Sequence, residues 1–149
     1  MRSIRLSAIA VLLAFSSSAM AELEPWKDYD ISDSVYQISA IKVQPNMMDA
    51  YLEGIRDTWV AANDLAKELG HIEDYAIYSS QLAASGDFNL LLVIKFAETA
   101  DLAPSKERYE AFMAKWSEEQ EERSEQLVQN YPAMREITGA YLMREITMK

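Results

Sequence analysis

The residues of this sequence that could carry chemistry are few and scattered. His71 is the single histidine, and it directly follows Gly70, where a helix is expected to end. An imidazole could transfer a proton, but this junction position favours a capping or surface role. Ser79, Ser80 and Ser85 lack the G-x-S-x-G surroundings of a hydrolase nucleophile. We therefore recognise no catalytic cluster, and whether the protein is an enzyme stays open.

Residue spacing also argues against metal and nucleotide sites. With one histidine and no cysteine, the usual zinc ligand sets cannot be assembled. The acidic run SEEQEERSEQ (117–126) lacks EF-hand spacing, and its neighbouring carboxylates diverge around a helix. Calcium and magnesium stay open as alternatives because both accept oxygen ligands alone. The four glycines form no phosphate-binding motif, so we expect neither a metal site nor a nucleotide site.

A set of aromatic residues suggests a ligand pocket. Trp59 and Trp116 lie on the apolar stripes of two expected helices, while Tyr75, Tyr78 and Tyr141 lie on expected strands. Rings between helices and a sheet could bind a flat apolar ligand, with hydroxyls orienting it. Plain core packing is the alternative. The pocket candidates, with the lone histidine added, are Trp59, His71, Tyr75, Tyr78, Trp116 and Tyr141.

Six elements must position these residues. VYQISAIKV is β-rich and contains no breaker, so it predicts the first strand. Asn46 follows as an expected N-cap, and apolar residues at helical spacing then run to Gly70. The expected order is strand 35–43, helix 47–69, strand 71–80, strand 88–96, a helix from Ser105 to Pro132, and a strand centred on 137–146. This β-α-β-β-α-β order predicts a ferredoxin-like α+β sandwich, with two helices on one face of a four-stranded antiparallel sheet.

The third strand, FNLLLVIKF, is apolar on both faces at its centre. Leu90 and Leu92 point one way, and Leu91 and Val93 point the other. In an antiparallel sheet with one solvent-exposed face, apolar and polar residues should instead alternate along each strand. Because the helices cover one face only, we expect a second copy of the chain to cover the other. This predicts a homodimer through the open sheet face.

The last expected strand contains the five-residue sequence MREIT twice, and the two copies start nine residues apart. Side chains in a strand alternate with period two, so Ile137 and Ile146 would face opposite sides of one regular strand. We interpret the repeat as coincidence. The same alternation places Ile137 and Tyr141 on one face, unless a bulge at Gly139 changes the register.

The chain resembles the dimeric α/β-barrel superfamily, which includes antibiotic-biosynthesis monooxygenase-like and NIPSNAP-like domains. The resemblance covers residues 35–146 and rests on the element order, on KVQPNMMDAYLEGIRDTW and on EAFMAKWSEE. It implies a dimeric α/β barrel. The superfamily includes cofactor-independent oxygenases, isomerases, haem-binding enzymes and proteins without assigned activity. A haem ligand, if the resemblance extends so far, would be His71.

Residues 1–21 have the features of a secretory signal peptide. Arg2 and Arg5 precede an apolar run, and Ala19-Met20-Ala21 fits the small-residue rule for cleavage. We expect cleavage after Ala21, an extended N-terminal arm over residues 22–32 and a single domain over residues 33–149. The protein would then be periplasmic or secreted. Since it has no cysteine, packing or association must replace disulfides.

The net charge of the chain limits the classes of partner that it can bind. The chain has 24 acidic and 14 basic residues, for a formal net charge of −10. Such a surface repels phosphate backbones and offers no polybasic patch to lipids, so we expect no nucleic acid partner. After signal cleavage, no remaining segment is apolar enough for a membrane span.

The expected function is therefore an exported, homodimeric small-molecule-binding or interaction module. Its ligand would be small and apolar or aromatic. The alternative is a cofactor-independent monooxygenase or isomerase that acts on a small aromatic or polyketide-like substrate in a Tyr- and Trp-lined pocket. No cofactor is expected, and the haem alternative rests on His71.

Overall fold

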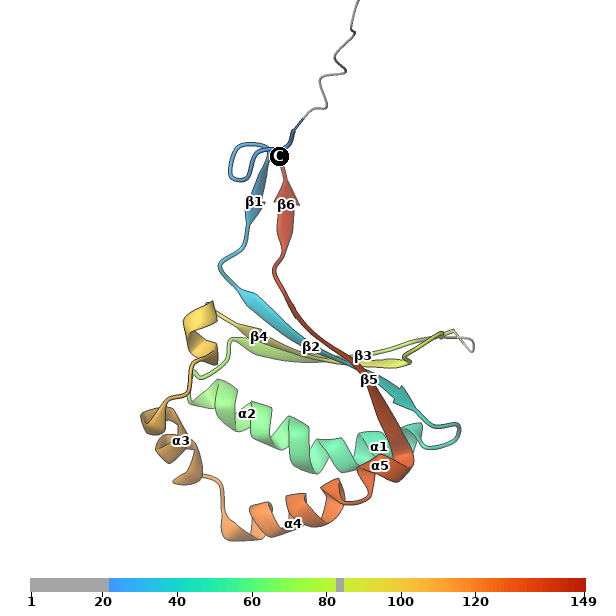
Figure 1. Cartoon of the computed structure of the whole chain (residues 1–149). Coiled ribbons are helices and arrows are strands. Elements are labelled where there is room, and N and C mark those ends of the chain that lie inside the picture. The colour runs from blue at the N-terminus through green and yellow to red at the C-terminus, as the bar shows by residue number, and fades with distance from the viewer. Residues whose placement is uncertain (1–21, 83–84) are drawn as a thin grey trace, which may run out of the picture.

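The computed structural model describes residues 22–82 and 85–149, so the expected signal peptide lies outside the described residues. Its main sheet is antiparallel with strand order β3-β4-β2-β5. The strands are β2 (Val35–Val43), β3 (Asp74–Ser79), β4 (Leu90–Phe96) and β5 (Arg135–Met143). The helices lie on one face of this sheet (Figure 1). The predicted ferredoxin-like α+β fold is confirmed.

The first strand has the predicted bounds, but the long helix after it is not uniform. It consists of α1 (Met48–Ile55), a π-helical turn η1 (Arg56–Val60) and α2 (Ala61–Glu68). Asn46 is not the N-cap: it has a φ of 65°, a left-handed conformation that asparagine tolerates, and Met47 takes the N-cap position.

Gly70 ends this helix as expected, with a φ of 70°. The Gly70 amide donates to the Lys67 carbonyl at 3.0 Å, and the His71 amide donates to the Ala66 carbonyl at 2.8 Å. This pair of bonds is a Schellman motif, which satisfies two of the carbonyls left free at the helix end. The backbone of His71 therefore closes the helix.

The second predicted helix is three helices. They are α3 (Lys106–Met113), α4 (Glu118–Val128) and α5 (Tyr131–Met134), and a short 3₁₀ turn η2 (Thr99–Leu102) precedes them. Ser105 caps α3 as predicted, and Ser117 restarts the chain as α4 by accepting a hydrogen bond from the Gln120 amide at 3.1 Å. Pro132 does not end the helix. It lies in the first turn of α5, where its missing N–H breaks no helical hydrogen bond.

The last predicted strand is divided between two sheets. β5 ends at Met143, and β6 (Ile146–Met148) pairs instead with β1 (Tyr29–Ile31). The two short strands form a ribbon that projects from the side of the main sheet opposite the helices (Figure 1). Part of the expected N-terminal arm is therefore held by the C-terminal strand, and Lys149 forms an ion pair with Asp30 at 2.8 Å.

A bulge interrupts β5. Ala40 pairs with Gly139 and Ile41 pairs with Ile137, so Thr138 is an extra residue in the ladder. The Thr138 hydroxyl donates to the Ala40 carbonyl at 3.2 Å. The bulge separates Ile137 from Tyr141, so the expectation that they share a face is wrong. Ile137 faces the helices with Ile41, and Tyr141 faces the other way.

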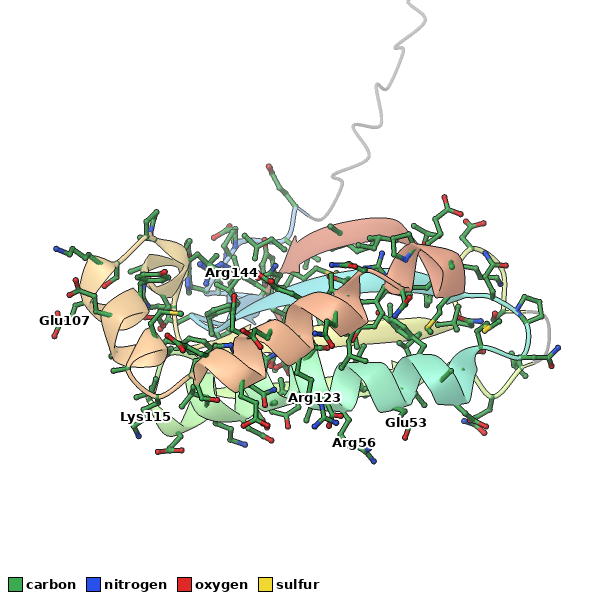
Figure 2. All side chains as sticks on the ribbon, turned by 90° about the horizontal axis from the view of Figure 1, so that it is seen from below. Glu53, Arg56, Glu107, Lys115, Arg123 and Arg144 are labelled. Carbon is green, nitrogen blue, oxygen red and sulfur yellow. The ribbon has the colours of Figure 1, made fainter. Side chains whose placement is uncertain are left out.

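The core lies between the sheet and the helices. Seven buried residues form it: Ile41, Val43, Tyr51, Ile55, Leu90, Leu92 and Tyr131. Charged side chains lie on the outside of the helical layer, where Glu53, Arg56 and Arg123 are mostly exposed (Figure 2). None of the helices within the described ranges is long and apolar enough to cross a membrane.

The opposite side of the sheet, here called the open face, has no helix over it (Figure 1). The pairing register assigns to it Tyr36, Ile38, Ala40, Ala76, Tyr78, Leu91, Val93, Tyr141 and Met143. Tyr78, Tyr141 and Met143 are more than half exposed. The charged residues on the same side lie toward the strand ends and are Lys42, Asp74, Lys95 and Glu136.

Candidate functional site

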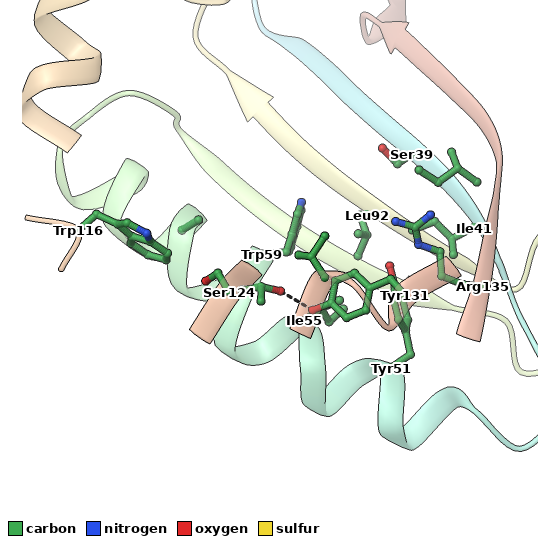
Figure 3. A pocket seen from close by; sticks show the side chains of 14 residues that line it. Ser39, Ile41, Tyr51, Ile55, Trp59, Leu92, Trp116, Ser124, Tyr131 and Arg135 are labelled. Carbon is green, nitrogen blue, oxygen red and sulfur yellow. Dashed lines mark hydrogen bonds between the residues drawn. The ribbon is translucent and has the colours of Figure 1, made fainter. Parts of the chain in front are cut away.

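A cavity of about 380 Å³ lies between the sheet and the helices, beside the core (Figure 3). The sheet contributes one wall, with Ser39 and Ile41 of β2, Leu92 of β4, and Arg135 and Ile137 of β5. These residues alternate along their strands, which is why they share the helix-facing side. Arg135 and Ile137 are two residues apart on β5, so they share this side.

The helices contribute the other wall. Thr58 and Trp59 both come from the π-helical turn η1, and Tyr131 comes from α5. A π turn breaks the regular helical hydrogen-bond pattern and often occurs at functional sites. Side chains bind two carbonyls of this turn: Gln120 donates to the Asp57 carbonyl at 2.6 Å, and Asn63 donates to the Trp59 carbonyl at 2.7 Å. The first bond also attaches α4 to the turn.

The cavity opens between α4 and the edge strand β5. Val128 and Ile137 both line it, yet about half of each side chain is exposed, at 49% and 53%. The inner end is closed by Tyr51, Ile55 and Leu92, all buried. A ligand would therefore enter past α4 and extend toward the core.

Two hydroxyls are linked in the cavity wall. The Tyr131 and Thr58 side-chain oxygens lie 2.6 Å apart, and Thr58 Oγ1 donates to the Gly54 carbonyl at 3.2 Å (Figure 3). Because the Thr58 hydroxyl has one hydrogen, Tyr131 must be the donor to Thr58. Gly54 allows this approach, since a Cβ there would lie 3.0 Å from Tyr131 Cε1. The Tyr131 hydroxyl is thus already engaged with the protein.

Arg135 brings a positive charge to the cavity. Its guanidinium carbon lies 5.9 Å from the centroid of the Tyr131 ring, a cation–π distance. Tyr131 in turn packs edge-on against Tyr51, with centroids 5.3 Å apart. Burial is the largest effect on the Tyr51 hydroxyl and raises its pKa, and a hydrogen bond from Arg135 opposes that rise. Tyr51 is therefore a neutral phenol at physiological pH.

Three of the six predicted pocket residues lie at or next to this cavity. Trp59 and Trp116 line it. Tyr75 lies behind Trp59, with the two rings edge-to-face and their centroids 5.3 Å apart. The Tyr75 hydroxyl donates to Asp64 Oδ1 at 2.6 Å, and this bond to a carboxylate is the main cause that raises the Tyr75 pKa to about 12. Tyr75 supports the Trp59 wall and does not line the cavity.

The other three predicted residues lie elsewhere. Tyr78 and Tyr141 are on the open face, so the expectation that they point between helices and sheet is wrong. Strand alternation explains it for Tyr78, which is three residues from Tyr75 and so on the opposite face. The bulge explains it for Tyr141. His71 borders a separate depression beside α3, with Phe96, Tyr109 and Phe112.

Six polar residues of the cavity were not among the predicted ones: Ser39, Tyr51, Thr58, Ser124, Tyr131 and Arg135. Tyr51 lies on the apolar stripe of its helix, so its spacing predicted a core position and did not indicate a role for its hydroxyl. The acidic run around Ser124 indicated a solvated surface. Arg135 could have been found from its spacing, because it is two residues before Ile137.

The lining contains hydroxyls, indoles and one guanidinium but no carboxylate or imidazole. Across residues 22–82 and 85–149, no three His, Asp or Glu side chains converge as a metal-ion site would require. General acid–base catalysis needs a group that titrates near the working pH. Such a lining is better suited to binding and orienting a molecule than to transferring its protons.

No protein-family model and no curated protein sequence matches this chain. Among solved structures, it is similar to a NIPSNAP family protein of unknown function from Agrobacterium tumefaciens, with a TM-score of 0.52 and 17% identity over 82% of this chain and 96% of that one. It also matches HapK from Hahella chejuensis, with a TM-score of 0.45 and 16% identity over 74% and 91% of the two chains. A dimeric ferredoxin-like protein of unknown function from Thermobifida fusca has a TM-score of 0.38 and 8% identity over 76% and 91%.

At such identities the first likeness shows a shared fold, and it does not transfer an activity. The predicted resemblance to NIPSNAP-like, ferredoxin-like domains is confirmed at the level of fold.

Proposed function

We propose that this protein is a homodimeric small-molecule-binding domain whose ligand lies in the cavity between the sheet and the helices. The cavity itself carries the proposal. It measures about 380 Å³, opens to solvent and is lined mostly by apolar and aromatic side chains. Its size falls within the range of ligand pockets.

The lining supports a flat, apolar ligand. Trp59 and Trp116 offer ring faces or edges, and the aliphatic residues around them exclude water. The Tyr131–Thr58 bond is satisfied within the protein, so it shapes the wall and leaves little capacity for chemistry. This lining favours binding over the oxygenase or isomerase alternative, and binding of this kind requires no cofactor.

The open face supports association with a second copy of the chain. Its centre is apolar and its charges lie toward the strand ends, which matches the apolar core and polar rim of protein interfaces. A monomer would leave Tyr78, Tyr141 and Met143 exposed beside Leu91 and Val93. Two open faces that pack together would bury both sets in one barrel-like core.

We also propose that the protein is exported. The basic start, apolar run and small-residue cleavage site of residues 1–21 support signal-peptide processing near Ala21. We place the mature protein in the periplasm or outside the cell, where it would bind its ligand without disulfides.

Calorimetric titration with naphthamide, an uncharged flat ring compound, tests the binding proposal. Ala62 lines the cavity, so Ala62→Phe should fill part of it and weaken binding about tenfold or more. Ala50→Phe, on the exposed side of α1, is the matched control and should bind as the wild type does. No binding to the wild type, or equal binding to Ala62→Phe, would refute the cavity as the ligand site.

A further inference from the structure

Arg135 differs from the other arginines that the structure describes. Arg56, Arg108 and Arg123 form ion pairs with carboxylates, and Arg144 donates to the backbone carbonyls of Ser32 and Asp33. Arg135 forms no ion pair within residues 22–82 and 85–149, although acidic residues outnumber basic ones in this chain. Its Nε is buried and has no hydrogen-bond partner there.

The surroundings do not neutralise this charge. Among the described residues, the guanidinium lies against the Tyr131 ring and interacts with the Tyr51 hydroxyl, and both groups are uncharged. The nearby cavity walls are Ile41, Leu92 and Ile137. Arg135 is partly buried, and its Nε is shielded from water without a hydrogen-bond partner among the described residues. A buried donor of this kind is normally paired, so the arrangement is incomplete. An anion at this position would supply what the protein lacks.

We infer that Arg135 binds the carboxylate of a ligand whose apolar, ring-containing body fills the rest of the cavity. The inference rests on the proposed function and specifies its ligand class: aromatic or similarly bulky monocarboxylic acids. Arg135 is the single cation in the lining, so one negative charge is matched and a phosphate dianion is not. The planar guanidinium also pairs with a carboxylate through two parallel hydrogen bonds.

A second unpartnered group lies in the same lining. Ser124 Oγ, on α4, is buried and has no hydrogen-bond partner within the described residues. Figure 3 shows Ser124 and Arg135 on different sides of the cavity, with Trp59 and Tyr131 between them. Buried polar atoms are normally hydrogen-bonded. A ligand with a carboxylate at one end and a hydroxyl or carbonyl at the other would satisfy both residues.

The test compares naphthoate with naphthamide, which have the same ring and differ in charge. At neutral pH, calorimetric titration of the full-length mature protein should show about tenfold tighter binding of naphthoate, as a charge-assisted hydrogen-bond pair would give. Arg135→Gln should abolish this preference, because only naphthoate loses a charged partner. Arg56→Gln, a surface arginine outside the cavity, is the control and should keep the preference.

The outcomes separate the two proposals. Equal affinity of the wild type for acid and amide, or a preference that survives Arg135→Gln, overturns the role of Arg135 but leaves the cavity as a binding site. Failure of both probes to bind overturns both. Tighter binding of naphthyl phosphate than of naphthoate overturns the carboxylate assignment. If Arg135→Gln does not fold, the wild-type comparison and Arg135→Lys, which keeps the charge but not the fork and should bind naphthoate more weakly, decide the question.

Discussion

The hydroxyl oxygens of Tyr131 and Thr58 lie 2.6 Å apart and join α5 to the π turn η1, although the two residues are 73 positions apart in the chain. Tyr131 is buried, and its ring also contacts Tyr51 and the Arg135 guanidinium. One residue of the short helix α5 thus connects the π turn, the first helix and the start of β5. The shape of the cavity depends on this residue.

Tyr131→Phe should lower the free energy of unfolding by about 1 kcal/mol, because it removes the hydrogen bond to Thr58 and keeps the ring. Urea denaturation followed by circular dichroism measures the change. Tyr109→Phe, at an exposed position on α3, is the matched control and should have no measurable effect. Equal stabilities of all three proteins would show that the bond contributes nothing.

Gly54→Ala should destabilise the fold although alanine is the better helix former. The new Cβ would lie 3.0 Å from Tyr131 Cε1 and 3.2 Å from its hydroxyl oxygen. We expect a net loss of about 1 kcal/mol, since overpacking outweighs the helix-propensity gain. In a Tyr131→Leu background, which removes those atoms, the same substitution should become neutral or stabilising. A destabilisation of the same size in both backgrounds would place the strain elsewhere.

Leu92→Asp should prevent stable folding. Leu92 is 7% exposed in the core between sheet and helices, so the substitution buries a charge without a partner. The expected loss is about 4 kcal/mol or more. Leu82→Asp makes the same chemical change at a residue that is 75% exposed and should melt like the wild type. Near-native melting of Leu92→Asp would mean that the core lies elsewhere.

The hydrogen bond from Tyr75 to Asp64 predicts a loss of stability in alkali. It raises the pKa of Tyr75 from 10.0 to about 12, because the bond requires the protonated phenol. A pKa that is higher in the folded state stabilises the fold fully below pH 10 and stops doing so as the pH rises toward 12. Denaturant titrations across this window should therefore show a steeper decline for the wild type than for Tyr75→Phe. Parallel declines would contradict the coupling.

Tyr141→Lys should convert the proposed homodimer into monomers. The residue lies on the open face, where two copies would place like charges in a buried apolar interface. Light scattering gives the mass directly. Tyr109→Lys, at a comparably exposed tyrosine on α3, should remain dimeric. A monomeric wild type at micromolar concentration would overturn the interface itself.

The element order was predictable because strands and helices have different hydrophobic periods. Val35–Val43 has the expected bounds, and Ser105 and Gly70 mark a helix start and a helix end as their local chemistry requires. The subdivisions were not predictable. Side-chain hydrogen bonds from Gln120 and Asn63 stabilise the π turn at Arg56–Val60. The spacing of apolar residues does not indicate such bonds.

The site was predictable only in part. The two tryptophans were found because large rings on apolar helix stripes point inward. Tyr78 was misplaced although strand alternation, applied to Tyr75 and Tyr78 together, assigns them to opposite faces. The face on which Tyr141 lies depends on a bulge, and the bulge depends on how β5 pairs with β2. The local spacing of apolar and polar residues does not indicate long-range strand pairing of this kind.

The bulge at Thr138 has a consequence for how the chain can change in length. Because Thr138 opposes no residue of its own on β2, losing one residue between Thr138 and Ala140 can be absorbed by closing the bulge. Arg135 would then still point into the cavity and Tyr141 outward. An added residue at the same place would need a second distortion, so this strand can tolerate shortening by one but not lengthening.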